Sequence, residues 1–314
     1  MFSLLGGVFL GWSLGSNDAS NVFGTAVSSR MLKFWVAAVL ASVFVVTGAI
    51  VSGQPGIETL KGLTSIRLDQ AVISSVAAAV TVTIMTFLGL PVSTSQAVVG
   101  GIMGIGILNQ QINLGGLGKV VACWVGTPVG ALIIAIPLYY IVAAIYNKLN
   151  LSLFRSDSML RFGLVAAGSY GAYALGANNV ANVTAVFVGA GLITVFLGTL
   201  IGGVSIALGI LTYSKPVMET VGKKLVKLDP FSAFIVVLAE AITVHIYTMI
   251  GVPVSTSQAV IGAVIGVGIV KGAHTVRKKT LKNILLAWAL TPVVACFIAL
   301  IIDFTYNSHY IPHQ

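Results

Sequence analysis

Long apolar stretches alternate with short polar ones along the 314 residues of the chain. A helix that crosses a bilayer needs about 20 consecutive, mostly apolar residues, and ten stretches approach that length. A polar stretch at about 147–161 divides them into two groups of five. This pattern predicts an all-α polytopic membrane protein with about ten membrane segments. The expected segments are 3–28, 34–53, 70–88, 91–108, 117–147, 162–189, 192–213, 231–250, 253–270 and 283–306.

Two motifs occur once in each group of segments. The stretch Gly15–Asn21 returns in altered form as Gly176–Asn182. The stretch Pro91–Gln96 returns unchanged as Pro253–Gln258, at nearly the same offset along the chain. Two separate motifs that share one offset indicate an internal duplication, which is common in membrane transporters.

The duplication predicts a first repeat at 1–155 and a second at 156–314. Each repeat crosses the membrane five times if every segment spans it. It crosses three times if segments such as 70–88 and 91–108 form re-entrant hairpins. Both numbers are odd, so the second repeat is inverted with respect to the first. The sequence therefore predicts two inverted-topology repeats.

The composition fits a membrane protein. Charged residues make up only 8% of the chain and hydrophobic residues 57%, with a mean hydropathy of +1.02. An ordinary soluble domain has about 25% charged residues, and so few charges could not cover the surface of a soluble domain of this size. The composition thus excludes a soluble enzyme, a nucleic-acid-binding domain and a disordered protein. Cys123 and Cys296 lie in apolar stretches, where small buried residues are expected.

The basic residues predict the orientation. Three of them, Lys61, Arg67 and Lys119, fall on the side of the N-terminus, and the other 14 fall in loops on the opposite side. The positive-inside rule makes that opposite side the cytoplasm, so both termini are expected to be extracytoplasmic in a multi-pass protein of the cell membrane. The 14 residues are Arg30, Lys33, Lys148, Arg155, Arg161, Lys215, Lys223, Lys224, Lys227, Lys271, Arg277, Lys278, Lys279 and Lys282.

The first duplicated motif places polar side chains in the middle of an apolar segment. An ionised carboxylate is costly there, and Ser, Asn and Asp compete with helical hydrogen bonds. We therefore expect a helix broken near the membrane midplane, with oxygen atoms that suit a hard cation such as Na⁺. Hydrogen bonding between helices is the alternative role. The candidate cation-binding residues are Asn17, Asp18 and Asn21 in the first repeat and Asn178, Asn179 and Asn182 in the second.

The second motif is typical of a helix start. Proline is favoured at the first helical position, and the hydroxyl and amide side chains that follow it add donors. The N–H groups of a helix N-terminus and the helix dipole favour an anion. Two such N-termini from inverted halves would converge, although simple helix capping also explains one copy. The candidate anion-binding residues are Ser93, Thr94, Ser95, Gln96, Ser255, Thr256, Ser257 and Gln258.

Glu240 is an acid within an apolar segment and hence a functional candidate. It could ligate a cation, carry a proton or bond to a broken helix. We expect Na⁺ at Asp18, Asn21, Asn182 and Glu240. His245 lies on a different helical face and is expected to pack in the interior. There is no nucleophile–base set or metal-ligand spacing, so no catalytic residue, enzyme activity or cofactor is expected.

No Lys or Arg falls in the middle of a predicted segment. A bound anion would therefore have no fixed positive charge to neutralise it, because helix N-termini supply only partial charge. Cations bound together with the anion would complete the compensation. This favours symport of an anion with Na⁺ or H⁺ over exchange.

The duplicated motifs resemble the inorganic phosphate transporter family, over nearly the whole chain. Gly15–Asn21 and Gly176–Asn182 are similar to its signature, and the two Pro-Val-Ser-Thr-Ser-Gln stretches to a second family motif. The resemblance implies phosphate near the hairpin tips, cations beside the signature residues, import driven by Na⁺ or H⁺, and commonly a homodimer. The chain departs from the family at Asn179 (usually Asp), at Gln96 and Gln258 (commonly His) and at Val45 (often Glu).

The sequence is also compatible with two rival functions. The nearest is transport of sulfate or another tetrahedral oxyanion, and the second is a passive channel. Phosphate near neutral pH keeps a proton that it can donate to a carboxylate, whereas sulfate has none. Asp18 therefore favours phosphate.

Overall fold

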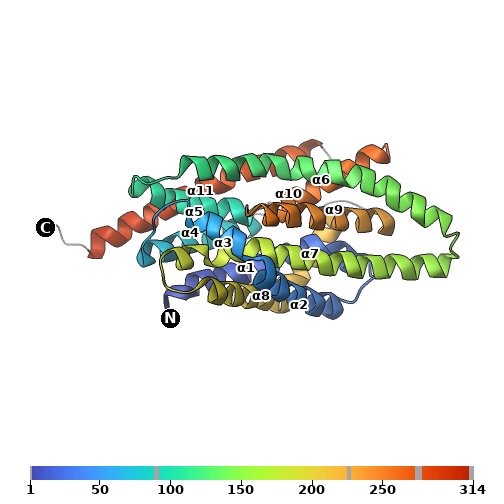
Figure 1. Ribbon diagram of the computed structural model, residues 1–314, viewed down its shortest axis with the longest axis horizontal. Helices are drawn as coiled ribbons and strands as arrows, with labels where there is room; N and C mark the ends of the chain where they lie inside the picture. The colour runs from blue at the N-terminus through green and yellow to red at the C-terminus, as the bar shows by residue number, and fades with distance from the viewer. Residues whose placement is uncertain (1, 88–91, 225–227, 273–277, 311–314) are drawn as a thin grey trace.

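The computed structural model describes residues 2–87, 92–224, 228–272 and 278–310, and these residues form helices and no strand (Figure 1). The prediction of an all-helical protein is confirmed. The elements are η1 (Phe2–Leu4), α1 (Leu5–Ser28), α2 (Phe34–Ser52), α3 (Gln54–Lys61), α4 (Leu68–Phe87), α5 (Thr94–Leu108), α6 (Leu114–Lys148), α7 (Leu153–Gly189), α8 (Val195–Lys224), α9 (Pro230–Met249), α10 (Thr256–Val270) and α11 (Lys278–Tyr310).

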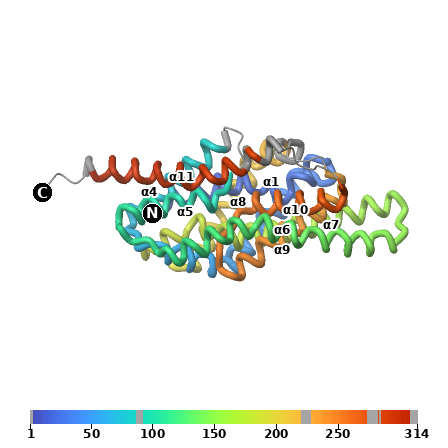
Figure 2. Tube along the Cα trace, turned by 90° about the horizontal axis from the view of Figure 1, so that it is seen from above, coloured from blue at the N-terminus to red at the C-terminus, as the bar shows by residue number. Residues whose placement is uncertain are grey.

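Six helices of the described part are long and apolar enough to cross a membrane: α2, α4, α6, α8, α9 and α11. α5 and α10 are shorter apolar helices of 15 residues each. The total of ten membrane segments stays a prediction. The hairpin of α6 and α7 extends beyond the other helices at one end of the bundle, and α11 extends beyond them at the other (Figures 1 and 2).

The predicted start of the segment 162–189 is wrong, because its helix begins within the polar stretch at 147–161. α7 begins at Leu153, directly after Ser152 in extended conformation. Asp157 and Arg161, one turn apart, form an ion pair on the exposed helix surface. Polar residues are compatible with a helix wherever that helix is exposed, so polarity alone did not mark a linker.

The predicted break in the signature helices is also wrong. α1 continues through Gly15–Asn21, and α7 continues through Gly176–Asn182. The hydroxyl groups of Ser16 and Ser20 each donate to a carbonyl three residues back, at 2.7 Å, and so bond within the helix. The amides of Asn178 and Asn182 find partners in the two hairpins. The polar side chains therefore do not displace the helical backbone bonds.

In each half of the chain, the helix with the signature stretch packs on a helix of the other half. α1 packs along α8, and α7 packs along α2. A Cβ at Gly15 would lie 2.0 Å from the carbonyl oxygen of Ile206, and a Cβ at Gly176 would lie 2.0 Å from that of Val45. Only glycine permits such an approach between two backbones. The signature helix of each half is thus packed on the second long helix of the other.

The two signature helices run in opposite directions. Gly7 of α1 lies against Phe187 near the end of α7, whereas Phe23 lies against Gly168 nearer its beginning. Antiparallel counterparts are the arrangement that inverted repeats require.

The hairpins α4–α5 and α9–α10 are each closed at their base by side chains at matching positions. Gln70 and Asn109 exchange two amide hydrogen bonds, of 2.8 and 3.1 Å, between α4 and the end of α5. At the second hairpin, Lys271 pairs with Asp229 and donates to Ser232. By the offset of the duplicated motif, Lys271 is the counterpart of Asn109 in the second repeat, and Ser232 is the counterpart of Gln70. We call the contacts of Asp229, Ser232 and Lys271 the basal latch.

We expect Lys271→Gln to weaken the basal latch. Burial disfavours the charged form of Asp229, but hydrogen bonds from Lys271 and Ser232 outweigh it and lower its pKa from 3.8 to about 2. Since the pKa falls on folding, this stabilisation is present above the ordinary pKa and is lost as the pH falls toward 2. The pair is partly exposed, so the loss in melting temperature at pH 7 is expected to be about 1–3 °C.

Thermal melting in detergent at pH 7 and at the lowest pH the protein tolerates measures this effect. The difference in melting temperature between wild type and Lys271→Gln should become smaller at low pH. Lys282→Gln, which alters an exposed lysine without an ion pair among the described residues, serves as control. A difference that is constant with pH would contradict the role of Asp229.

Candidate functional site

The two repeated Pro-Val-Ser-Thr-Ser-Gln stretches meet in the interior. The Ser95 hydroxyl donates to the carbonyl oxygen of Val254 at 3.0 Å, and the Ser257 hydroxyl donates to the carbonyl oxygen of Val92 at 3.2 Å. Each hairpin thus bonds to the extended backbone of the other. These reciprocal bonds bring together two motifs that lie far apart in the sequence, one in each repeat.

Each of the two short helices starts at this meeting point with a serine cap. The Ser93 hydroxyl accepts from the backbone N–H of Gln96 at 3.4 Å, and the Ser255 hydroxyl accepts from that of Gln258 at 3.3 Å. The earlier N–H groups of a helix have no partner within the helix. The N-termini of α5 and α10 therefore direct donors and partial positive charge toward the same place.

The proline of the motif does not begin the helix, contrary to the sequence-based expectation. Pro253 precedes the start of α10 at Thr256, and Ser255 takes the capping position. Pro91 lies outside the described residues. A serine side chain can accept from an N–H of the first turn, which makes it a better cap than proline. The residues before the cap remain extended and are available for pairing with α7.

Asn178 of α7 holds this extended backbone. Its Nδ2 donates to the carbonyl oxygen of Val254 at 2.7 Å, and its Oδ1 accepts from the N–H of the same residue at 2.9 Å. Ser95 donates to the same carbonyl. Both ends of the Asn178 amide are thus used to position the tip of the second hairpin, although the sequence suggested a cation ligand.

Asn182 lies one turn further along α7 and contacts the first hairpin. Its Nδ2 donates to the Ser95 hydroxyl at 2.9 Å and to Oδ1 of Asn179 at 2.8 Å. Asn182 Oδ1 and Asn179 Nδ2 are buried and have no hydrogen-bond partner among the described residues. An unpartnered buried amide oxygen is unfavourable unless a ligand occupies it.

α1 approaches from the opposite side with Asp18 and Asn21. The Asn21 amide donates to the Thr256 hydroxyl at 3.0 Å, and this hydroxyl is also hydrogen-bonded to the Asp18 carboxylate. Glu240 of α9 lies close enough for the charge of Asp18 to act on it, and it packs beside Gly171. Both carboxylate oxygens of Glu240 are buried without a partner among the described residues.

Further polar groups of the site are also without a protein partner. In the described part of the chain these are Thr94 Oγ1, Gln96 Oε1 and Gln258 Oε1, all buried. Asn17 is partly buried, and its backbone carbonyl accepts from Ser20. The structure thus joins residues of the signature stretches in α1 and α7 to residues of the two Pro-Val-Ser-Thr-Ser-Gln stretches.

The site has acidic charge and no basic residue to balance it. Asp18 and Glu240 are buried, with 5% and 0% exposure, whereas no Lys or Arg of the described residues is buried. A buried carboxylate is costly unless a positive charge is paired with it. No group of three His, Cys, Asp or Glu residues occurs in the described part. Neutral oxygen atoms with few carboxylates suit a hard cation better than a transition metal.

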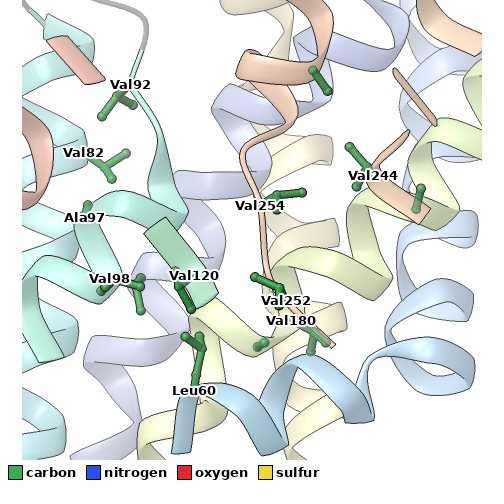
Figure 3. Close-up of a cluster of buried hydrophobic side chains, with 14 of the residues drawn as sticks. Leu60, Val82, Val92, Ala97, Val98, Val120, Val180, Val244, Val252 and Val254 are labelled. Atoms are coloured by element: carbon green, nitrogen blue, oxygen red, sulfur yellow. The ribbon is translucent and has the colours of Figure 1, made fainter. Parts of the chain in front are cut away.

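Apolar side chains surround the polar groups. Val92, Val180 and Val254 alternate with residues of the site and belong to one buried apolar cluster (Figure 3). Dry surroundings strengthen electrostatic interactions at the site.

Two contacts outside the buried site were not expected from the sequence. Lys119 Nζ donates to the carbonyl oxygen of Ile250 at the end of α9, at 3.2 Å. α3, which was not predicted, packs along α7, with Gly56 against Ala181 of the signature. Pro55 at the start of α3 was the available signal, since proline favours a first helical turn.

His245 has a definite partner. Its Nδ1 lies 2.7 Å from the Tyr170 hydroxyl, and its ring meets those of Tyr170 and Tyr173 edge-on. These contacts agree with its interpretation as an interior packing residue.

Comparison with known proteins extends this picture. Residues 14–154 and 148–299 each match the model of the phosphate transporter family. A candidate phosphate permease of Methanocaldococcus jannaschii is 32% identical over 295 residues, which cover 94% of each chain. The sulfate permease CysP of Bacillus subtilis is 30% identical over 305 residues, which cover 95% of this chain and 85% of the permease.

A solved structure shows the same fold. The structure of a sodium-dependent phosphate transporter superposes with a TM-score of 0.82 at 26% identity and covers 98% of both chains. The resemblance drawn from the signature stretches is therefore confirmed. The chain belongs to the phosphate transporter family, and it is a multi-pass membrane transporter rather than an enzyme.

Proposed function

We propose that the protein imports inorganic phosphate by symport with Na⁺ or H⁺. The observation that carries this proposal is the meeting of two helix N-termini beside two buried carboxylates, with no buried Lys or Arg among the side chains that the structure describes. Such a site attracts an anion through its N–H groups and at the same time requires positive charge that the protein does not supply.

The anion is proposed to lie between the N-termini of α5 and α10. Each helix end is equivalent to about half a positive charge, so together they balance about one negative charge. The hydroxyl and amide side chains of both motifs add hydrogen bonds, and the Thr94 hydroxyl has no competing partner among the described residues. Ser93, Ser95 and Gln96, with Ser255, Thr256, Ser257 and Gln258, complete the proposed substrate site.

The cations are proposed to bind beside the anion, between α1, α7 and α9. Asp18 and Glu240 supply carboxylates there, and Asn182 supplies an amide oxygen without a partner among the described residues. Asn21 lies on the same face, and Asn17 and Asn179 flank this set. Sodium ions or protons at the carboxylates would relieve their repulsion and the repulsion of the anion. Binding of anion and cation would then favour each other, which is the basis of coupled transport.

The membrane arrangement follows from the same elements. We propose that 1–155 and 156–314 are inverted repeats and that α4–α5 and α9–α10 are re-entrant hairpins. The antiparallel α1 and α7 support this arrangement. With the basic loops in the cytoplasm, both termini are extracytoplasmic at the cell membrane. The functional unit is proposed to be a homodimer, as the family resemblance implies.

Sulfate is a second candidate substrate because one relative of similar identity is a sulfate permease. Asp18, which bonds to the motif residue Thr256, argues against it. Hydrogen phosphate can donate to a nearby carboxylate, whereas sulfate can only be repelled.

Uptake into proteoliposomes tests the function. Labelled phosphate should accumulate when an inward Na⁺ or H⁺ gradient is imposed and should stop when the gradients are collapsed. Imposing each gradient alone identifies the coupling ion. Full inhibition by equimolar sulfate would refute phosphate selectivity, and accumulation independent of both gradients would refute symport.

Two equivalent threonines should separate anion binding from cation coupling. Thr94→Val removes a hydroxyl without a partner among the described residues. It should raise the KM for phosphate about 10- to 150-fold, since a bond to a charged group contributes about 1.5–3 kcal/mol. Thr256→Val removes the hydroxyl shared by Asn21 and Asp18. It should therefore also weaken the dependence of the initial uptake rate on cation concentration. Initial rates over matrices of phosphate and cation concentration measure both. Identical kinetics of the two variants would contradict the assignment.

A further inference from the structure

An apolar groove lies at the end of the bundle that carries the α6–α7 hairpin. Its cavity of about 370 Å³ is lined by α6, α7 and the first half of α9. The lining includes Tyr146, Phe162, Gly163, Phe231, Phe234 and Leu238. The groove follows α9 from Phe231 to Leu238, about 10 Å at the helical rise per residue.

Basic residues lie at the outer end of the groove. Lys148 follows Tyr146 at the end of α6, and Arg155 precedes the lining residues by one turn at the start of α7. Both side chains are exposed, and neither forms an ion pair among the described residues. The neighbouring acid Asp157 is already paired with Arg161. The groove thus has an apolar length and an uncompensated positive end.

The hairpin that bears these charges is also unusually apolar at its tip. Leu149 is 48% exposed, and Leu153 and Phe154 are 88% exposed. α7 has 37 residues, and a helix of that length is about 55 Å long and exceeds the bilayer. Apolar and basic side chains together at a protruding end are characteristic of the membrane interface.

We propose that the groove binds one anionic phospholipid, with an acyl chain along α9 and the phosphate at Lys148 and Arg155. The proposed topology places this lipid in the cytoplasmic leaflet, but the binding itself does not depend on the transport mechanism. A second copy of the chain fits less well. A two-fold interface pairs the same patch with itself, so it would bring the uncompensated basic ends together.

Native mass spectrometry of the purified protein tests the proposal with phosphatidylglycerol and phosphatidylcholine of the same acyl chains. Wild type should retain one phosphatidylglycerol in preference to phosphatidylcholine. Lys148→Gln with Arg155→Gln should abolish this preference, a loss of at least about 10-fold in affinity. Ala166→Phe, which fills the lining, should reduce binding of both lipids. Arg30→Gln with Lys33→Gln, in a different predicted cytoplasmic loop, is the matched control and should retain the preference.

Equal retention of both lipids by wild type would overturn the proposal, as would unchanged preference in the Lys148 and Arg155 double variant. That double variant alters only exposed side chains, so it should fold even if Ala166→Phe does not. If Ala166→Phe converts a dimer to monomers and leaves phosphatidylglycerol binding unchanged, the groove is a subunit interface and the proposal is wrong.

Discussion

Asp18→Asn is expected to abolish cation-driven phosphate uptake and to leave the fold intact. Asparagine has the same shape and can still bond to Thr256, so the packing of α1 should be retained. The variant removes one of the two buried carboxylates, Asp18 and Glu240, at which a cation is proposed to bind. Loss of one ligand or its support commonly lowers cation affinity about 10- to 100-fold, and coupling requires that affinity.

Uptake under an imposed gradient and equilibrium binding of ²²Na⁺ measure the two consequences separately. Asp157→Asn is the matched control, because that carboxylate is exposed and pairs with Arg161 on the helix surface. The control should transport at the wild-type rate. Undiminished gradient-driven uptake by Asp18→Asn would refute the assigned role of this residue.

Gly176→Ala is expected to prevent stable folding. The new Cβ would lie 2.0 Å from the carbonyl oxygen of Val45 and 2.7 Å from its carbonyl carbon, both backbone atoms that no rotamer change can move. α2 and α7 would have to separate. Forced expansion of a packed interior costs about 1–3 kcal/mol and sometimes more, and backbone atoms give way less readily than side chains.

Gly118→Ala is the matched control for this prediction. Gly118 lies in α6, and its Cβ would meet no atom of the described residues within 4 Å. Alanine also favours a helix by about 1 kcal/mol over glycine. It should therefore melt at or above the wild-type temperature. The measurement is the yield and melting temperature of both variants in detergent. Equal melting of Gly176→Ala and wild type would show that α2 and α7 are less closely packed than described.

The sequence was informative where chemistry was duplicated. The signature asparagines and the paired serine motifs predicted a site formed by both halves, and the structure brings Asn182, Ser95 and Thr256 to one place. A mid-segment acid such as Glu240 was visible because a charge in an apolar stretch is costly. Membrane character followed from composition alone.

The features that were not predicted depend on contacts between residues far apart in the sequence. The helix break was predicted from local competition for hydrogen bonds, but Asn178 found its partner in Val254, 76 residues away. α3 is short and only moderately apolar, so the search for long apolar segments passed over it. The hydrogen bond of Lys119 could not be predicted, because its acceptor is a backbone carbonyl oxygen and every residue type has one.

The exchanged packing of the two halves has a consequence for biogenesis. Because α1 packs chiefly on α8, and α2 on α7 and α8, the first half has few partners of its own while the second is still being synthesised. The helices of the first half are therefore expected to be inserted in the bilayer one by one and to pack only after the helices of the second half have been synthesised. Two separately expressed halves should accordingly assemble only with each other, as a complementing pair, and each should be degraded when made alone.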